Sequence, residues 1–477
     1  MKKTILSTFI LILASPFAAF SQVSLDSCRN MALRNNKLIR IAQANLEGAS
    51  HLKSAAKAAY LPGIDFTGTY FYNQHIINLL EEDAKLPTMS FDPATGSYKY
   101  NLVTGADGKP VVNPSTGSYI PSEIAVIPKD ALSYDVHNVF AGAFTLTQPI
   151  YMGGQIRALN KIAGFGEKIA AAMTNNATQE IVYTVDEAYW TVVSLKEKKR
   201  LAESFVALTD SLCHNVRLML DQGVATRSDL LSVEVRVNEA NIALTKVSNG
   251  LVLSRMALAQ VCGLPPETTM DLADENLNSE DLKPAPPVDI NEVYSRRADL
   301  EAVRQTVNLL KSREKLSLSE MLPKIALVGA YTFSNPNLID GFQKRFGGGF
   351  SVGAMLQVPI WHWGGDYNKY RAAKSTTKAQ QLLLEDLEEK VDLQVKQARF
   401  SLDEADKTFR MASLNMKKAE ENLRQAQIGF REGVLTTSDV LAAQTAWLGA
   451  NSEKIDAEIG LRLARTYLEK VAGRLGW

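Results

Sequence analysis

The feature of this sequence that most restricts its fold is an internal duplication. Two motifs occur twice: Leu220-Asp-Gln-Gly-Val-Ala-Thr-Arg-Ser-Asp-Leu-Leu231 returns as Phe430-Arg-Glu-Gly-Val-Leu-Thr-Thr-Ser-Asp-Val-Leu441, and Gln148-Pro-Ile-Tyr-Met-Gly-Gly154 returns as Val358-Pro-Ile-Trp-His-Trp-Gly-Gly365. Pro149 and Pro359 are 210 residues apart (359 − 149), and so are Asp229 and Asp439 (439 − 229). Because the segment between the two motifs keeps its length, the sequence predicts two copies of one structural unit.

A third repeated pair shows where the copies differ. Leu61-Pro62 and Leu322-Pro323 are 261 residues apart (323 − 62), so the first copy carries 51 additional residues (261 − 210). They fall in a stretch rich in Gly, Pro, Ser and Asn, and we expect a long loop over 73–135. The predicted organisation is a first repeat over 22–263, a Pro-rich acidic linker over 264–289 and a second repeat over 290–477.

The N-terminus has the pattern of a secretory signal peptide. Lys2 and Lys3 precede an apolar run, Ile5–Phe20, and Ala19-Phe20-Ser21 offers small residues at the usual cleavage offsets. We expect residues 1–21 to be removed on export. A retained membrane anchor is the alternative, although the polar segment after Ser21 has no stop-transfer pattern.

The three cysteines, Cys28, Cys213 and Cys262, lie far apart in sequence and imply no disulfide framework. We expect all three to be buried thiols in helices. Leu25-Asp26-Ser27-Cys28 is weakly similar to a lipoprotein cleavage box, which leaves lipidation of Cys28 as an alternative. Asp26 fits such a box poorly, and the apolar run ends several residues too early.

Composition and motifs exclude several classes of function. Lysine plus arginine total 52 and aspartate plus glutamate total 52, a balance that gives no electrostatic footprint for nucleic acid. The five histidines show no metal-ligand spacing, and the chain has no phosphate-binding loop, nucleophile elbow or metalloprotease motif. We therefore expect neither an enzyme nor a bound cofactor or metal.

Apolar and small residues in the second copy recur in alternating steps of three and four. That spacing favours a narrow coiled-coil seam over the broad apolar face of a globular helix. The seam residues are Leu384, Leu387, Val391, Val395, Ala398, Leu402, Ala405, Phe409, Ala412, Met416, Ala419, Leu423, Ala426 and Phe430. The first copy shows the same spacing less regularly.

The predicted helices have matching lengths. Between the Gly-Gly pair and Gly223 or Gly433, each copy leaves roughly 67 residues for one helix of about 100 Å. Two shorter helices of roughly 50 Å are expected in each copy, and end to end they match the long one. The sequence thus predicts a wall of paired helices. The shorter stretches are 25–59, 228–261, 288–321 and 438–474.

Two strand-like runs lie between the first short helix and the long helix of each copy. Over about ten residues, apolar side chains alternate with small or polar ones, which is the pattern of transmembrane strands. The apolar faces are Ile64, Phe66, Gly68, Tyr70 and Tyr72; Phe140, Gly142, Phe144 and Leu146; Ile325, Leu327, Gly329, Tyr331 and Phe333; and Phe350, Val352, Ala354, Leu356 and Val358. Two surface hairpins on a helical bundle are the alternative interpretation.

Prolines and aromatic residues gather where these runs meet the helices. Proline blocks helix continuation and favours extended backbone before it, so we expect four prolines to form the strand–helix junctions. Aromatic residues at the same level are typical of a membrane–water interface. The prolines are Pro62, Pro149, Pro323 and Pro359, and the aromatic residues are Tyr60, Tyr151, Trp361 and Trp363.

Four membrane strands cannot close on themselves. An open sheet edge in lipid leaves backbone groups unsatisfied, and known membrane barrels begin at about eight strands. The chain must therefore oligomerise. Two copies would supply eight strands and three would supply twelve, and the residues alone leave both open.

With these motifs, the sequence resembles the TolC family of outer-membrane efflux proteins over nearly the whole mature chain. The resemblance implies a homotrimer, with a 12-stranded transmembrane β-barrel (four strands per chain) continuous with a long periplasmic α-helical barrel. It also implies a passive exit duct in the outer membrane that works with a periplasmic adaptor protein and an inner-membrane transporter. A structural or adhesive envelope protein on the same scaffold is the alternative function.

The turns after the long helices carry the predicted site. Glycine ends each long helix, and Thr-x-Ser-Asp restarts a helix in the manner of a capping box. By resemblance, these turns lie at the closed periplasmic end, where Asp439 forms a gate ring with Asp229 in support. The same resemblance gives the helix-tip residues a role in adaptor contact; they are Gly223, Thr226, Arg227, Ser228, Gly433, Thr436 and Ser438.

The second tip also departs from the family pattern. Ala442 stands where relatives often place a second carboxylate, and Leu435 and Phe430 stand where they place a basic latch residue or a tyrosine. These departures leave the chemistry of the latch open.

Overall fold

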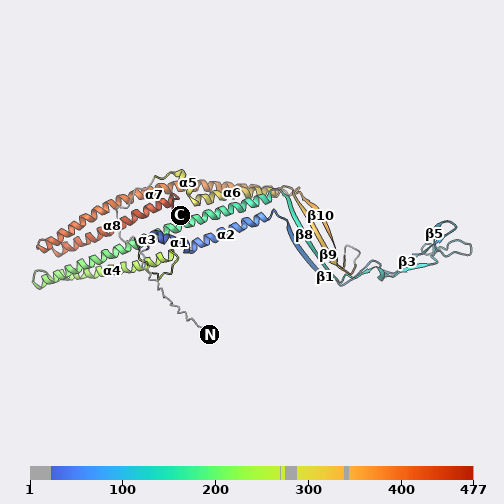
Figure 1. Ribbon diagram of the computed structural model, residues 1–477, viewed down its shortest axis with the longest axis horizontal. Helices are drawn as coiled ribbons and strands as arrows, with labels where there is room; N and C mark the ends of the chain where they lie inside the picture. Colours follow the sequence, from blue (N-terminus) through green and yellow to red (C-terminus); the bar gives the residue numbers. More distant parts are fainter. Residues whose placement is uncertain (1–22, 269, 274–286, 338–342, 476–477) are drawn as a thin grey trace, which may run out of the picture. The chain divides into compact units, whose positions relative to one another are not determined.

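The computed structural model describes residues 23–268, 270–273, 287–337 and 343–475, which separate into a helical unit and a strand unit. The helical unit contains most of both repeats, and the strand unit contains the segments between the short and long helices (Figure 1). The predicted signal peptide, 1–21, and the central part of the predicted linker, 274–286, lie outside the described residues.

Two long helices run through the helical unit. Helix α3 spans Gln155–Asp221 and helix α7 spans Gly365–Arg431, and each has 67 residues. The length predicted from the distance between the glycine motifs is therefore confirmed in both copies. The first residues of the two helices are 210 positions apart (365 − 155), and so are their last residues (431 − 221), as the duplication requires.

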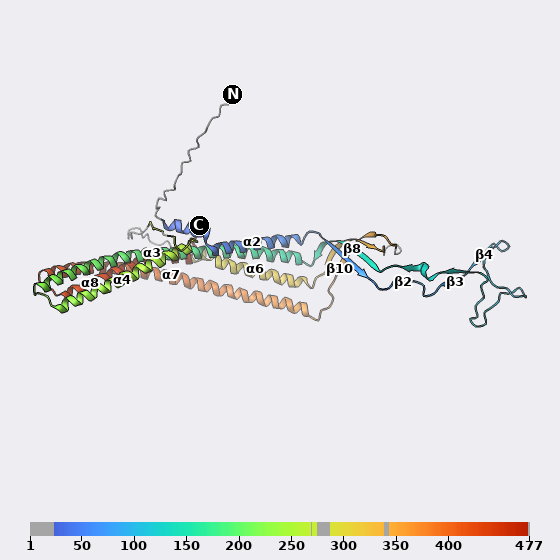
Figure 2. The same cartoon turned by 90° about the horizontal axis from the view of Figure 1, so that it is seen from below.

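The shorter helices run along the long ones. Helix α2 (Lys37–Ala58) packs on the first part of α3, where the amide of Asn160 donates to the carbonyl of Ala56 at 2.7 Å. Helix α4 (Arg227–Val261) packs on the second part of α3, and α6 (Ala298–Ser319) and α8 (Thr437–Val471) repeat this arrangement along α7 (Figures 1 and 2). The predicted match of two short helices to one long helix is confirmed.

The first short helix of each copy is broken once, which the sequence interpretation missed. Helix α1 (Leu25–Asn35) ends at Asn36, whose backbone is extended. The Asn36 side chain accepts from the N–H of Leu38 at 2.8 Å and donates to the carbonyl of Val261 at 2.9 Å. An asparagine that satisfies nearby backbone groups competes with the helix, so a break replaces the predicted continuous helix over 25–59.

The corresponding break in the second copy is at Arg297. Helix α5 (Ile290–Arg296) ends there, and Arg297 has φ −70° and ψ 118°. Its guanidinium donates to both carboxylate oxygens of Asp299, at 2.9 and 2.5 Å, in the first turn of α6. The two breaks are 261 residues apart (297 − 36), so they occupy the same position in the repeat although the residues differ.

The predicted seam of the second copy is the side of α7 that packs against its neighbours. The most buried seam residues are Val391, Val395, Ala398, Ala412, Leu423, Ala426 and Phe430. Seam residues between them, such as Leu384 and Leu402, are partly buried against the same clusters. The narrow apolar stripe therefore supports a sheet-like wall of helices rather than a globular core.

The strand unit contains one four-stranded antiparallel sheet with the order β1-β8-β9-β10. Its strands are β1 (Gly63–Tyr72), β8 (Asn138–Met152), β9 (Lys324–Asn335) and β10 (Gly347–Gln357). Both predicted hairpins are present, and they pair with each other through β8 and β9. The predicted loop over 73–135 forms small two-stranded pairs: β2 (Ile77–Asn78) with β7 (Ser133–Tyr134), β3 (Ala84–Pro87) with β6 (Ile124–Ile127), and β4 (Met89–Asp92) with β5 (Ser97–Tyr100).

The register places the four predicted apolar faces on one side of the sheet. Phe66 is opposite Phe144, Phe144 is opposite Tyr331, and Tyr331 is opposite Phe350. All four rings are exposed in the single chain, Phe350 at 83%. A slip of one residue would turn this face over, so the aromatic row fixes the register. An exposed apolar face of this kind is the surface that a bilayer covers.

Gly142 lies opposite Gly68 on one side and Phe333 on the other, and its close contact with the Phe333 ring leads to a testable prediction. A Cβ atom on Gly142 would lie 2.5 Å from Cζ of Phe333, because that ring lies over the glycine from the neighbouring strand. We expect Gly142→Val to displace the ring and destabilise the folded protein by about 1–3 kcal/mol, the usual cost of overpacking. The loss can be measured as a smaller fraction of heat-resistant oligomer on gels. A second substitution in the same chain, Phe333→Ala, should restore most of the lost stability.

The sheet is open at both edges. Within the described part of the chain, β1 and β10 each pair on one side only in this sheet. No helix among the described residues combines the length and the apolar composition needed to cross a membrane.

Candidate gate at the helix tips

The turn after α3 is built by its glycine. Gly223 has φ +77°, its N–H donates to the carbonyl of Leu220 at 2.9 Å, and the N–H of Val224 donates to the carbonyl of Met219 at 2.8 Å. These two bonds are the Schellman arrangement, which satisfies the last carbonyls of a helix and requires a left-handed residue.

The turn after α7 repeats this arrangement. Gly433 has φ +75°, its N–H donates to the carbonyl of Phe430 at 3.2 Å, and the N–H of Val434 donates to the carbonyl of Gly429 at 2.8 Å. The predicted C-terminal caps are therefore present in both copies, and the chain reverses direction after a turn of the same length each time.

The two aspartates close capping boxes on the next helices. Asp439 accepts from the backbone N–H of Thr436 at 2.8 Å and from its hydroxyl at 2.7 Å, and the Asp439 N–H donates to the Thr436 hydroxyl at 3.3 Å. Asp229 makes the same three bonds with Thr226 at 2.9, 2.6 and 3.2 Å. The predicted capping boxes are thus confirmed, and they fix the direction of both carboxylates.

Both carboxylates carry a negative charge at neutral pH. The hydrogen bonds from the Thr436 hydroxyl and N–H hold the pKa of Asp439 below its usual range, and those from Thr226 do the same for Asp229. Both residues bond through Oδ2, and Asp439 is exposed to solvent while Asp229 is half-buried. Each tip therefore presents a fixed anionic group.

The two tips pack on each other through an apolar cluster within the helical unit. Its buried members come from both copies: Leu212, Val216, Leu230, Val233, Phe430 and Val440. Polar contacts flank it, with Arg236 donating to the hydroxyl of Thr445 at 2.6 Å and Gln444 donating to the carbonyl of Leu208 at 3.4 Å. Phe430, at a latch position by resemblance, is therefore part of the apolar packing between the copies.

The copies differ beneath the turns in a way that the sequence interpretation missed. Met219 and Ala225 in the first tip correspond to Gly429 and Leu435 in the second (429 − 219 = 210; 435 − 225 = 210). A Cβ atom on Gly429 would lie 2.9 Å from Cδ1 of Leu435. In the first tip the large side chain is Met219, before the turn, and in the second tip it is Leu435, after the turn. The Leu435 side chain packs over Gly429.

The two turn glycines give a prediction that isolates backbone strain. Nothing lies within 4 Å of a Cβ atom built on Gly433. We expect Gly433→Ala to destabilise the tip by about 1–2 kcal/mol, because only the left-handed backbone opposes the new side chain. Hydrogen exchange of the amides around the turn should accelerate. Gly449→Ala is the matched control: it also has open space but lies within helix α8, and it should not accelerate exchange.

The four junction prolines lie close to the ends of the sheet strands. Pro62 and Pro323 immediately precede β1 and β9, and Pro359 follows β10 by two residues. Pro149 lies inside β8, next to an irregularity in pairing between Pro149 and Tyr151. A strand tolerates proline at such a position because the ladder is already interrupted there.

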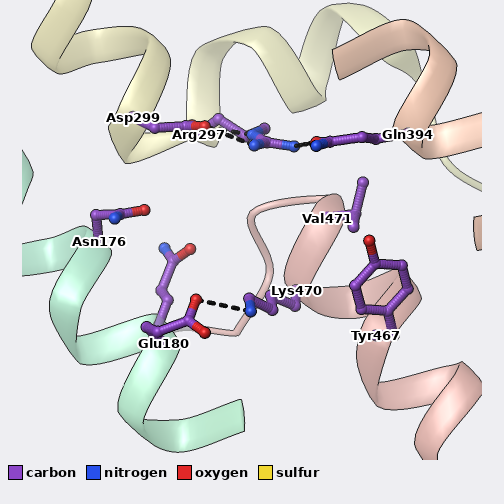
Figure 3. A pocket seen from close by; sticks show the side chains of 9 residues that line it. Asn176, Glu180, Arg297, Asp299, Gln394, Tyr467, Lys470 and Val471 are labelled. Atoms are coloured by element: carbon purple, nitrogen blue, oxygen red, sulfur yellow. Dashed lines mark hydrogen bonds and ion pairs between the residues drawn. The ribbon is translucent and has the colours of Figure 1, made fainter. Parts of the chain in front are cut away.

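A polar recess in the helical unit is internally satisfied. It is lined by residues of α3, α6, α7 and α8, including Asn176, Gln179 and Tyr467. Figure 3 shows its two bonded groups: Lys470 lies 2.7 Å from a carboxylate oxygen of Glu180, and Arg297 donates to Gln394 at 2.9 Å as well as to Asp299. The charges are already paired, so the recess offers no evident ligand site. Among the described residues, no three His, Cys, Asp or Glu side chains gather as metal ligands.

Comparison with known proteins gives one family and several similar folds. Residues 117–264 and 290–474 match the model of the outer membrane efflux protein family. The chain is similar to the CmeC outer membrane channel of Campylobacter jejuni (14% identity, TM-score 0.71, 94% of this chain and 85% of that chain). It is also similar to the outer membrane protein VceC of Vibrio cholerae (14%, 0.71, 95% and 97%) and to the open state of the MtrE outer membrane channel of Neisseria gonorrhoeae (17%, 0.71, 94% and 88%). No curated protein matches the sequence.

Proposed function

The chain belongs to the outer membrane efflux protein family, and from this premise we propose how its parts serve the channel. As a member, it is an outer-membrane exit duct that passively conducts exported molecules, with its helices in the periplasm. Three chains form a twelve-stranded barrel and a helical barrel. The family is one of channels rather than enzymes.

The observation that carries this function is the open four-stranded sheet. It presents one exposed aromatic face and leaves β1 and β10 each with an unpaired side in the described chain. Such edges are not stable in lipid, so β10 of one chain must pair with β1 of the next. Three copies then supply twelve strands, an even number within the known range for membrane barrels.

The proposed partners are a periplasmic adaptor protein and an inner-membrane transporter that supplies the energy. We assign adaptor contact to the tip residues predicted for it, of which Gly223, Thr226, Arg227 and Ser228 lie in the first copy and Gly433, Thr436 and Ser438 in the second. All seven are exposed in the single chain. An exposed turn with a fixed backbone suits docking, because little ordering is required when a partner binds.

We assign the gate to the same tips. Asp439 is the ring residue and Asp229 supports it, and threefold symmetry would bring three Asp439 carboxylates together. Three fixed negative charges at a constriction favour cations and oppose anions. The buried Phe430 cluster favours the packed arrangement of the tips, so an opening that parts the two copies must separate apolar surfaces as well as the polar contacts beside them.

A complementation experiment tests the function against the alternative of a structural or adhesive envelope protein. Deletion of the gene is expected to raise intracellular accumulation of exported dyes or drugs, and the intact gene should restore export. A second complementing gene, lacking only residues 79–132 of the long loop, should also restore export. Normal export after deletion, accompanied by loss of surface adhesion, would favour the alternative.

A further inference from the structure

Two of the three cysteines meet in the core of the helical unit. Cys28 lies in the second turn of α1, and Cys262 caps the end of α4. The sulfur of Cys262 lies 3.7 Å from the carbonyl oxygen of Cys28, although the two residues are 234 positions apart. Both side chains are 0% exposed. The contact therefore joins the start of the described chain to the end of the first repeat.

The two thiols lie in a hydrophobic cluster that offers them no ligand or catalytic partner among the described residues. Its buried neighbours are apolar or aromatic and include Tyr189, Leu258 and Leu272. Within the described part of the chain, the two cysteines belong to no group of three or more His, Cys, Asp or Glu side chains that could hold a metal ion. A hydrogen bond between the two side chains raises the pKa of the Cys28 thiol, as does burial, and the same hydrogen bond lowers the pKa of the Cys262 thiol, so the two thiols act on each other directly.

The surrounding structure also argues against the lipid anchor considered for Cys28. Cleavage at the lipoprotein-like box would make Cys28 the first residue of the mature chain. Here Val23 pairs with Leu272, and Ser24 caps α1 by accepting from the N–H of Ser27 at 3.2 Å. These residues precede Cys28 and are part of the fold, and the Cys28 side chain itself is enclosed.

We propose that Cys28 and Cys262 form a disulfide bond in the mature protein. The inference rests on export to the periplasm, an oxidising compartment in which disulfides form and persist. The two S–H groups lose two protons and two electrons and form one S–S bond. The electrons pass by thiol–disulfide exchange to the disulfide of a periplasmic thiol oxidase, which becomes a dithiol. The exchange takes place while the newly exported chain folds, before the cluster closes over both sulfurs.

The bond would fasten helix α1 to the rest of the helical unit. Helix α1 has only 11 residues, too few to be stable alone, and the break at Asn36 separates it from α2. A covalent link to the end of α4 holds α1 in place. The link also closes a long loop of chain, which restricts the conformations of the unfolded state.

The third cysteine, Cys213, lies in α3, is half-buried, and belongs to the separate cluster at the tips.

Thiol counting on the intact protein tests the proposal without any variant. Outer-membrane protein is alkylated with iodoacetamide under denaturing conditions, with or without prior reduction, and weighed by mass spectrometry. We expect one alkylated thiol before reduction, Cys213, and three after it. A digest without reduction should contain the Cys28 peptide joined to the Cys262 peptide. Three alkylated thiols before reduction, or a bond that involves Cys213, would overturn the proposal.

Matched alanine variants extend the test. Cys28→Ala and Cys262→Ala should each leave two alkylated thiols before reduction, and Cys213→Ala should leave none. Native protein treated with a small dithiol should keep the bond, and protein in denaturant should lose it, because both sulfurs are enclosed in the fold. Wild-type protein made in a strain without periplasmic thiol oxidase should show three alkylated thiols under denaturing conditions before reduction, and a lower midpoint of thermal unfolding.

Discussion

Replacement of Arg29 by methionine is expected to cause a large loss of stability in the helical unit. The Arg29 guanidinium binds both carboxylate oxygens of Asp186, with Nε to Oδ1 at 2.6 Å and Nη2 to Oδ2 at 2.5 Å. Asp186 is 0% exposed and Arg29 is 19% exposed. The variant leaves a buried charge without a partner, which costs about 3–5 kcal/mol.

The loss should depend on pH in a defined direction. Burial raises the pKa of Asp186 above its ordinary value of 3.8, and the Arg29 guanidinium opposes that rise. Without Arg29, the pKa of the folded state rises further, so the folded variant binds a proton more tightly than the unfolded chain does. Stability is then retained below the ordinary aspartate pKa and is lost as pH increases through the raised folded value. Thermal unfolding at pH 5 and pH 8 should show the larger deficit at pH 8.

Two controls separate this effect from a general loss of an ion pair. Arg200→Met removes the more exposed pair with Glu197 and should cost about 0–1 kcal/mol. The double variant Arg29→Met with Asp186→Leu replaces both charges by apolar groups and should recover most of the lost stability. A deficit that is equal at both pH values, or that persists in the double variant, would contradict the role given to the buried charge.

Much of the fold was predictable because the constraints are local and repeated. The glycine motifs set the length of α3 and α7, and the alternation from Ile64 to Tyr72 identified a strand and its apolar face. The spacing of Thr436 and Asp439 predicted the capping box, because both partners lie within one helical turn. These patterns need no knowledge of distant contacts.

Two features that escaped prediction depend on contacts between distant segments. The Asn36 side chain, which bonds Leu38 at the break, also donates to the carbonyl of Val261, and Cys28 contacts Cys262 across the first repeat. The pattern of Phe430 marks it as a seam residue, but its packing between the two tips depends on how the copies dock. A duplicated sequence reveals that two units exist without fixing the surface by which they meet.

Replacement of Asp439 by asparagine tests the proposed gate with little change in shape. Asparagine retains an oxygen that accepts from the Thr436 N–H, so the cap survives while the charge is removed. Three charges vanish from the trimer at once. Because close fixed charges act strongly on a passing ion, we expect the permeability ratio of cation to anion to fall by a factor on the order of ten.

The equivalent change in the first copy is the matched comparison. Asp229→Asn removes the same charge from an equivalent cap, and as a supporting residue it should lower the ratio by less than Asp439→Asn does. Reversal potentials in planar bilayers with a salt gradient measure both variants, and low salt should enlarge the difference because screening is weaker. Unchanged selectivity in Asp439→Asn, or equal shifts in the two variants, would remove Asp439 from the ring, since a ring at the constriction must act more strongly than a charge beside it.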